Sequence, residues 1–559
     1  MPPKKTATGR KAKANVAAAP TATKAKSAKS TSTAAAAAAK KPPAAKPEVN
    51  KKASQATKPV TAKRKRAAVD DDEADDDASA RRKKVPKAEA PAEKPKAKAV
   101  AKAPVKKETK AKPVAEPVVL NKAPTELFAV FACGSGECGE LGLGPSRTTS
   151  TIPRMNMALD PNDKTKHHVV QLACGGMHTI VLTADNKILT WGVNDEGALG
   201  RDTTWDGGLK DMDGDNSEEE DGDLNPHECS PVEVPSKHFP DGTVFTQVAA
   251  GDSCSFVLTA SGHVYGWGAF RDNKGDRRFC YDKAGKVVEI QKEPILVPAL
   301  EHVVQIACGA NHVLALDKAG QIWGWGSYEQ NQLGRQPFGR FQSETLLPRQ
   351  VRVCTRPIKY IASGEFHSFA VDRKDDVWSW GLNSFGEAGY AKQAGGDQAV
   401  LPHPMKIPGL CGKGVTQMAG GSHHSAAVTS EGQCFVWGRL DGGQLGIEFS
   451  KEQLEDDTLI RHDEYDKPRI CLRPTEVPGV GLVETVACGT DHTIFITKEG
   501  VGLATGFGSV GQLGLRHEED VNTVQPMQGK DIKGRKLIGA AAGGQFSIVM
   551  STADVPKAE

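Results

Sequence analysis

The chain has 559 residues, 58 of them glycine, and only 6% are aromatic, a composition that suits many short strands joined by turns. Its formal net charge of +3 hides an asymmetry, because residues 1 to 122 hold 32 Lys and Arg against 12 Asp and Glu. The remainder of the chain is therefore acidic, and two oppositely charged parts imply two different partners. No apolar run approaches the roughly 18 residues needed to span a membrane, and no apolar signal segment follows the first lysines, which excludes a membrane-spanning or secreted protein and predicts an intracellular one.

Residues 1 to 122 contain no Phe, Trp or Tyr. Such a segment cannot bury enough apolar surface to offset the entropy of ordering, so we predict a disordered basic tail. Within it, two basic clusters flank an acidic spacer in the arrangement of a bipartite nuclear localisation signal over residues 63–84, which predicts binding to a nuclear import receptor; a generic solvated charge run is the alternative. The signal residues are Lys63, Arg64, Lys65, Arg66, Arg81, Arg82, Lys83 and Lys84. A flexible polycation also binds DNA non-specifically by releasing counterions, so DNA is a second expected partner of the tail.

Residues 126 to 552 repeat a unit best seen at 169–200, where three short apolar strands are separated by glycines. A Trp-Gly slot recurs at Gly134, Gly192, Gly268, Gly326, Gly381, Gly438 and Gly508. An Ala-Cys-Gly slot recurs at Gly175, Gly251, Gly309, Gly364, Gly421, Gly489 and Gly543. The intervals are longer than those of WD40 or kelch repeats, and the signatures of both are missing.

The chain enters this region with a Trp-Gly half repeat and leaves it with an Ala-Cys-Gly half repeat. Two unmatched halves can pair with each other and so remove exposed sheet edges. We therefore predict an all-β fold, a seven-bladed β-propeller whose ring is closed by pairing of the N-terminal and C-terminal half repeats. The basic tail precedes this propeller, and a short C-terminal tail follows at 553–559.

Several motifs inside the repeats have structural rather than catalytic interpretations. The G-x-G-x-x-G stretches at 134–139 and 506–511 run into another strand instead of a helix, so we expect no dinucleotide cofactor. The acidic run at Asp211, Asp213 and Asp215 lacks the glycine and the bidentate glutamate of an EF-hand and is predicted to be a solvated loop. No P-loop and no combination of nucleophile, base and orienting group occurs, which predicts that the chain is not an enzyme of covalent chemistry.

Two further slots predict packing residues. One holds histidine in five copies, and because Phe replaces it elsewhere and the copies stand around a ring, we expect buried packing side chains and no metal site. These residues are His178, His312, His367, His424 and His492, with Cys254 and Phe546 in the other two copies. The other slot holds Cys174, Cys308 and Cys488, which are predicted to be buried thiols in a reducing compartment.

The repeats resemble the regulator of chromosome condensation family, the chromatin-bound guanine-nucleotide exchange factors for the small GTPase Ran. The most specific stretches are WGVNDEGALGRD at 191–202, AAGDSCSFVLT at 249–259, WGAFRDNKG at 267–275 and GGSHHS at 420–425. The resemblance implies a nuclear, chromatin-associated monomer that promotes GDP release from Ran and serves nucleocytoplasmic transport, spindle assembly and the cell cycle. Exchange requires no covalent chemistry, because the factor and the nucleotide prefer opposite conformations of the GTPase.

The resemblance also implies which residues face Ran, in the turns of one face of the ring, with a protruding wedge from the third repeat. The family's positions fall on Glu137, Asp252, Arg271, Asp272, Asn273, Asn311 and His424. Asn311 stands where the family has an acidic residue, so an ion-pair role at that position is in doubt. A non-catalytic propeller adaptor on chromatin is therefore the alternative function.

One basic loop resembles the family loop that docks arginines onto the acidic patch of the nucleosome's core histones. It spans residues 335–349, with Arg340 as the best candidate and Arg335 and Arg349 behind it. An ordinary exposed loop is the alternative. The acidic stretches at 206–228 and 448–467 have no predicted partner.

Overall fold

The computed structural model describes residues 119–206, 224–337, 344–396 and 399–553. The chain divides into two units, Met1–Glu108 and Thr109–Glu559, and every described residue belongs to the second. The localisation signal and nearly all of both predicted tails lie outside the described residues. The backbone N–H groups of Leu120 and Asn121 donate to the carbonyl oxygen of Ala260 at 2.7 and 3.2 Å. Folded structure therefore begins a few residues before the predicted start at 126.

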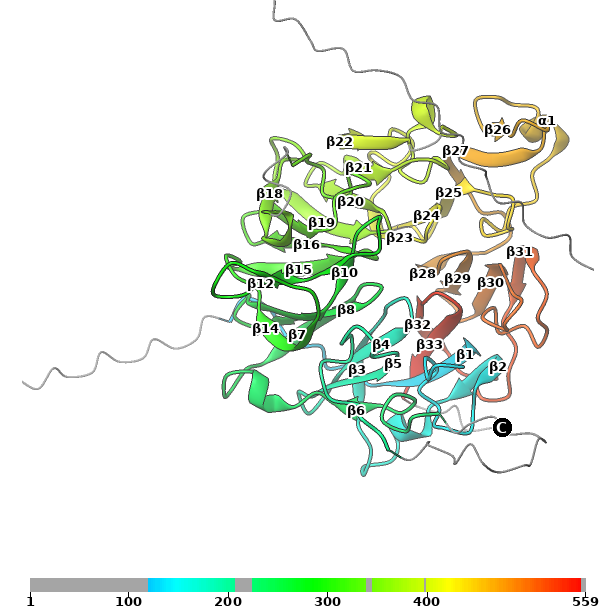
Figure 1. Ribbon diagram of the computed structural model, residues 1–559. Coiled ribbons are helices and arrows are strands. Elements are labelled where there is room, and N and C mark those ends of the chain that lie inside the picture. Colours follow the sequence, from blue (N-terminus) through cyan, green and yellow to red (C-terminus); the bar gives the residue numbers. More distant parts are fainter. Residues whose placement is uncertain (1–118, 207–223, 338–343, 397–398, 554–559) are drawn as a thin grey trace, which may run out of the picture. The chain divides into compact units, whose positions relative to one another are not determined.

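The described part is all-β, as predicted, with small antiparallel sheets arranged around a ring (Figure 1). The largest sheet contains β32 (Leu537–Ala542), β33 (Phe546–Thr552), β1 (Phe128–Ser135), β3 (Val169–Cys174), β4 (His178–Thr183), β5 (Ile188–Gly192) and β6 (Val232–Glu233), with β2 (Thr149–Met155) paired to β1. The next two sheets contain β7 (Phe245–Ala250), β8 (Cys254–Thr259), β9 (Val264–Gly268) and β14 (Gln291–Leu296), and then β15 (Val303–Cys308), β16 (His312–Asp317), β17 (Ile322–Gly326) and β18 (Arg349–Val351).

The remaining large sheets complete the ring. They contain β19 (Ile358–Ser363), β20 (His367–Asp372), β21 (Val377–Leu382) and β22 (Val400–Lys406); β23 (Val415–Gly420), β24 (His424–Thr429), β25 (Cys434–Arg439), β27 (Pro468–Glu476) and β26 (Ile460–His462); and β28 (Val483–Cys488), β29 (His492–Thr497), β30 (Gly502–Gly506) and β31 (Val521–Pro526). The one α-helix of the described residues is the short α1 (Lys451–Leu454). None of their helices is long and apolar enough to cross a membrane.

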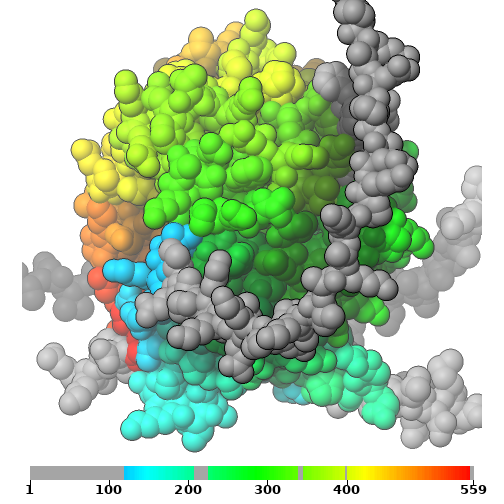
Figure 2. Space-filling view, turned by 90° about the vertical axis from the view of Figure 1, so that its left-hand side faces the viewer, coloured from blue at the N-terminus to red at the C-terminus, as the bar shows by residue number. Residues whose placement is uncertain are grey.

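The first strand of the ring pairs with the last. β1 and β33 are antiparallel partners from Phe128↔Thr552 to Gly134↔Phe546, whereas β1 contacts β3 through the single pair Phe128↔Val169. The largest sheet is thus two four-stranded groups joined at one point, and the predicted pairing of the terminal half repeats is present. In Figure 2 the first described residues, in blue, lie against the last ones, in red. Counted in this way, the four-stranded groups are consistent with the seven repeats of the sequence.

The strand register corrects one position of the repeat alignment. In the second repeat the slot glycine Gly192 pairs with His178, and in the last repeat His492 pairs with Gly506. The slot residue is therefore Gly506, and the assignment of Gly508 is wrong by two residues. The Trp-Gly signature is missing there, because Thr505 takes the place of tryptophan.

The histidine slot links each repeat to the next. His312 is fully buried, and its Nε2 lies 2.8 Å from the hydroxyl of Ser368, which itself donates to the carbonyl oxygen of Gln332 at 2.9 Å. Because that hydroxyl proton is already used, Nε2 must be the donor. Nδ1 is buried without a partner among the described residues, and burial lowers the pKa of His312 to about 3, so the ring is neutral. The equivalent pairs are His178–Ser255, His367–Ser425, His424–Thr493 and His492–Ser547. The predicted packing role of these histidines is confirmed.

Burial of these rings makes the stability of the fold depend on pH. Desolvation lowers the pKa of His178 and His492 to about 4 and that of His312, His367 and His424 to about 3. In the unfolded chain the same groups take up protons below about pH 6.5. Stability that is present above pH 6.5 is therefore lost as the pH falls toward 4.

We expect the free energy of unfolding to be lower at pH 5 than at pH 7 by at least about 2 kcal/mol, the contribution of one such histidine over that range. Urea denaturation at the two pH values measures it. The variant His312→Gln keeps an N–H donor but does not titrate, so its pH dependence should be shallower. An unfolding free energy that does not change between pH 7 and 5 would contradict this prediction.

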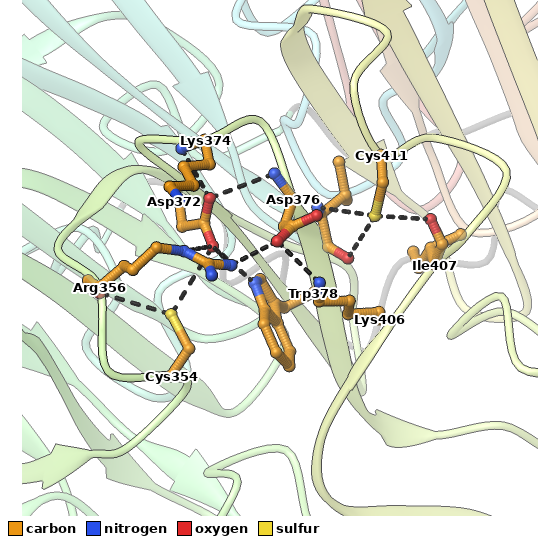
Figure 3. A network of polar contacts seen from close by, with 10 residues as sticks. Cys354, Arg356, Asp372, Lys374, Asp376, Trp378, Lys406, Ile407 and Cys411 are labelled. Atoms are coloured by element: carbon orange, nitrogen blue, oxygen red, sulfur yellow. Dashed lines mark hydrogen bonds and ion pairs between the residues drawn. The ribbon is translucent and has the colours of Figure 1, made fainter.

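An ion-pair network fixes the turn of the β20–β21 hairpin (Figure 3). Arg356, which lies just before β19, pairs with both Asp372 and Asp376. The side chain of Asp372 is fully buried, and Lys406 of β22 reaches Asp376 at 2.7 Å. The network therefore joins the linker, the hairpin and the outer strand of one sheet. This hairpin lies at the opposite end of the strands from the loops that form the candidate site.

Candidate functional site

The predicted partner-facing residues come from one end of the strands. In an antiparallel sheet the turn between the first and second strands and the loop after the third strand lie at the same end. The turns hold Asp252, between β7 and β8, and Asn311, between β15 and β16. The loops hold Glu137, after β1, and Arg271, after β9. We call this end of the ring the loop face.

A hairpin projects from the loop after β9. It pairs β10 (Phe270–Arg271) with β11 (Arg277–Arg278), and a second small hairpin pairs β12 (Cys280–Tyr281) with β13 (Val287–Val288). The base of the first hairpin is held by aromatic side chains, because the buried rings of Phe270 and Phe279 stack with centroids 5.4 Å apart. The predicted wedge is thus an exposed turn on a base anchored in the core.

Asp272 shapes the turn of this hairpin instead of facing a partner. Its Oδ1 accepts hydrogen bonds from the backbone N–H groups of Lys274 and Asp276, both at 2.9 Å, and its Oδ2 pairs with Arg278. Only 8% of its side chain is exposed. The expectation of a partner-facing Asp272 is therefore wrong, whereas Asn273 at the tip is exposed.

Two hydrogen bonds fix the backbone of Arg271, while its side chain is partly exposed. Its N–H donates to Oδ1 of Asn311 at 2.7 Å, and its carbonyl oxygen accepts from the hydroxyl of Ser327 at 2.6 Å. Half of the side chain remains exposed, at 50%, while the guanidinium pairs with the buried carboxylate of Glu196. The hydrogen bond to Glu196 raises the pKa of Arg271. Asn311 thus acts as an uncharged acceptor that positions the hairpin, a role that needs no ion pair.

The carboxylates of Glu196, Asp252 and Asp195 surround this arginine. Burial and the neighbouring Glu196 raise the pKa of Asp252, although Arg271 partly opposes the shift. Burial also raises the pKa of Glu365. Its carboxylate accepts hydrogen bonds from the hydroxyl of Ser422 and, at 2.8 Å, from that of Thr490. The loop face therefore presents the half-exposed side chain of Arg271 next to acidic side chains.

Asp252 and Glu365 occupy equivalent positions around the axis of the ring. The residue after the Ala-Cys-Gly glycine bonds to the next repeat through its backbone. Asp252 N–H donates to the carbonyl oxygen of Ala310 at 2.8 Å, and Ala310 N–H donates to the carbonyl oxygen of Glu365 at 3.0 Å. They border a cavity of about 780 Å³ that is lined by the innermost strands of all seven repeats. Among the described residues no group of three His, Cys, Asp or Glu is placed to hold a metal ion.

Two other predicted residues differ in their exposure. Glu137 is exposed on the loop face, and together with Asp195 it raises the pKa of Cys138, after the larger effect of burial. His424 is fully buried and bonds to Thr493 at 2.9 Å, so it cannot present its ring to a partner. Its role is corrected to packing; the adjacent His423, with 29% of its side chain exposed, is the histidine that reaches the surface.

The basic loop is only partly described. Arg340 lies outside the described residues. Arg349 is exposed and pairs with Glu344 at 2.9 Å. Arg335 is more buried, and its Nε and Nη2 atoms have no hydrogen-bond partner among the described residues. Arg349 is therefore accessible, whereas Arg335 is held against the protein.

Sequence reasoning missed Glu196 and Glu365. Glu365 shares the slot of Asp252, one residue after the Ala-Cys-Gly glycine, so the repeat alignment contained the signal for it. Glu196 had no such signal, because it lies in a variable position of the previous repeat and meets Arg271 only through the packing of neighbouring loops.

Comparison with known proteins gives one family. The model of the RCC1-like domain matches residues 129–549. The chain is 38% identical to the guanine nucleotide exchange factor SRM1 of Saccharomyces cerevisiae, over 75% of this chain and 86% of that protein. It is 30% identical to the human regulator of chromosome condensation, over 76% and 91% of the two proteins.

Two solved structures are similar in fold and sequence. One is Prp20p of Saccharomyces cerevisiae, described together with its binding to Gsp1p and histones (TM-score 0.69, 33% identity, covering 78% of this chain and 94% of that one). The other is yeast RCC1 (Prp20) bound to Kap60 (TM-score 0.69, 32% identity, covering 82% and 97%).

Proposed function

The chain belongs to the RCC1-like domain family, and on that premise we propose that it is a chromatin-bound guanine-nucleotide exchange factor for the small GTPase Ran. The observation that carries the assignment is the hairpin of the third repeat. It projects from the loop face on an aromatic base and presents Arg271, whose backbone is fixed on both sides by Asn311 and Ser327. An adaptor without exchange activity would need no such preorganised projection.

Exchange follows from competition between two ligands for different conformations of the GTPase. A rigid hairpin inserted beside the nucleotide favours the conformation in which the phosphate-holding loops are displaced, and the nucleotide favours the other. The acidic side chains around Arg271 suit cationic groups that the GTPase exposes when its phosphates leave. No bond is made or broken, so release of GDP and of GTP is accelerated alike, and the excess of cellular GTP sets the product.

The hydrogen bond from Arg271 N–H to Asn311 predicts the effect of changing that residue. Asn311→Ala removes the acceptor and should slow exchange about fivefold, or about 1 kcal/mol. Asn311→Asp keeps an oxygen at the same place and should stay within about twofold of the natural rate. GDP release from Ran measures both, and equal rates for all three proteins would show that Asn311 does not position the hairpin.

Contacts with chromatin are assigned to other parts of the chain. Prp20p is described with histones and with Kap60, which supports core histones and a nuclear import receptor as partners here. We assign histone contact to the loop with Arg340 and the exposed Arg349, non-specific DNA contact to the basic tail, and import to the signal at 63–84. We accordingly propose that the protein is nuclear and binds chromatin as a monomer.

A binding measurement tests the exchange assignment and separates it from the adaptor alternative. Affinity for nucleotide-free Ran should exceed affinity for Ran with bound GDP, and added GDP or GTP should dissociate the complex, because coupling between the two ligands is reciprocal. Affinity that does not depend on the nucleotide would favour the adaptor.

A further inference from the structure

Two adjoining hollows lie around the outer strand of the ring-closing sheet, β2. They measure about 980 and about 700 Å³. Six cationic residues line them: Arg147, Arg154, Arg516, Lys530, Lys533 and Arg535. Asp531 is the one acidic residue among the described residues that line them. We call these six residues and the space between them the β2 groove.

Closure of the ring assembles this groove from both ends of the folded unit. Arg154 belongs to β2, near the start, whereas Lys530 belongs to the segment between β31 and β32, near the end. The two segments touch directly, because Arg516 N–H donates to Thr151 at 2.9 Å and Met155 N–H donates to the carboxylate of Asp531 at 3.2 Å. One oxygen of the lone carboxylate thus accepts a hydrogen bond from the backbone of β2.

The cations of the β2 groove are not neutralised. Within the described residues, none of the six forms an ion pair with a carboxylate. Arg154 Nε and Arg535 Nη1 are buried and have no hydrogen-bond partner there, although the guanidinium of Arg535 lies over the ring of Phe131, 5.3 Å from its centroid. A buried donor without an acceptor costs free energy. Such a site gains most from a ligand that brings several anionic oxygens.

We propose that the β2 groove binds the phosphodiester backbone of duplex DNA. Arg147, Arg154 and Lys530 line both hollows, so the charges form one continuous track and not a single pocket. A track suits a regular row of phosphates, which a DNA strand presents about every 3.4 Å along its axis. No aromatic side chain of the described residues lines either hollow, so the proposed contact is with the phosphate backbone and not by stacking on bases. The inference rests on the chromatin part of the proposed function and not on exchange.

The test compares two triple variants of the full chain. Arg147→Gln, Lys530→Gln and Lys533→Gln together remove three exposed cations of the groove. Lys237→Gln, Lys318→Gln and Lys392→Gln together remove the same charge from exposed positions elsewhere on the ring.

Affinity for a short duplex of mixed sequence is measured against salt concentration. The groove variant should bind about tenfold more weakly than the control, with a slope of log affinity against log salt that is smaller by about 2.7, from three lost phosphate contacts. Equal losses in both variants, or no loss in either, would overturn the proposal.

A second measurement does not depend on the variants. Acetylation footprinting of the natural chain should show Lys530 and Lys533 protected by duplex DNA, with Lys237 and Lys318 unprotected. Protection by inorganic polyphosphate but not by DNA would show that the groove takes a different anion. GDP release from Ran should be the same for the groove variant and the natural chain, so a failure of the exchange assignment is visible separately.

Discussion

Replacing Arg271 by alanine is expected to slow GDP release from Ran at least about tenfold, a loss of about 1.4 kcal/mol of transition-state stabilisation. Arg271 is the cation of the hairpin that lies next to the carboxylates of Glu196 and Asp252, and half of its side chain is exposed. Asp252→Ala should have an effect of the same order, because Asp252 lies beside Arg271 and Glu196 at the centre of the loop face.

The control for this prediction is Arg277→Ala. Arg277 pairs with Arg271 across the hairpin and is exposed, but it forms no ion pair among the described residues. Its replacement removes the same charge from the same hairpin and should change the rate less than about twofold. If Arg271→Ala and Asp252→Ala both released GDP at the rate of the natural chain, the exchange site would lie elsewhere. Unfolding curves that match those of the natural chain would show that the ring is intact in both variants.

The second large effect concerns closure of the ring. Gly134 pairs with Phe546 of the last strand at φ +115°, and a Cβ atom there would lie 2.4 Å from the carbonyl oxygen of Gln545. That oxygen accepts a hydrogen bond from Ser135 N–H, so it cannot move aside without breaking the pairing of the two strands. We expect Gly134→Val to lower the free energy of unfolding by about 3 kcal/mol or more, from the strained backbone and the overpacking together.

Gly242→Val separates these two contributions. Gly242 also has a positive φ, +76°, but a Cβ atom there would have nothing within 4 Å. Its replacement should therefore show the backbone cost alone, about 1 to 2 kcal/mol. Urea denaturation of the two variants measures the difference, and equal losses would mean that the β1–β33 pairing tolerates a side chain at residue 134.

The fold could be predicted because the repeats carry their own register. Each copy places a glycine opposite the histidine slot, and the two unmatched half repeats indicate how the ring closes. The alignment failed only at Gly506, where Thr505 replaces the tryptophan that marks the slot elsewhere.

The site was predictable in part, for a physical reason. Asp252 and Arg271 lie in turns of one face of the ring, as the resemblance to the family implied. The direction of a side chain within a turn depends on neighbours that the repeat does not specify. Asp272 turns back onto its own hairpin, and His424 points into the next repeat.

The β2 groove could not be found from the sequence. Its cations belong to no motif, and Arg154 and Lys530 become neighbours only because the two ends of the ring pair. Linear charge counts show an acidic repeat region and give no sign of a basic track on it.

The central claim is exchange on Ran, and release of fluorescent GDP tests it most directly. Ran loaded with fluorescent GDP is mixed in a stopped-flow instrument with excess unlabelled GTP and a substoichiometric amount of the full chain. We expect release of all the label, at a rate proportional to the concentration of the chain. Release at the intrinsic rate of Ran, from a chain that is folded and binds Ran, would contradict it.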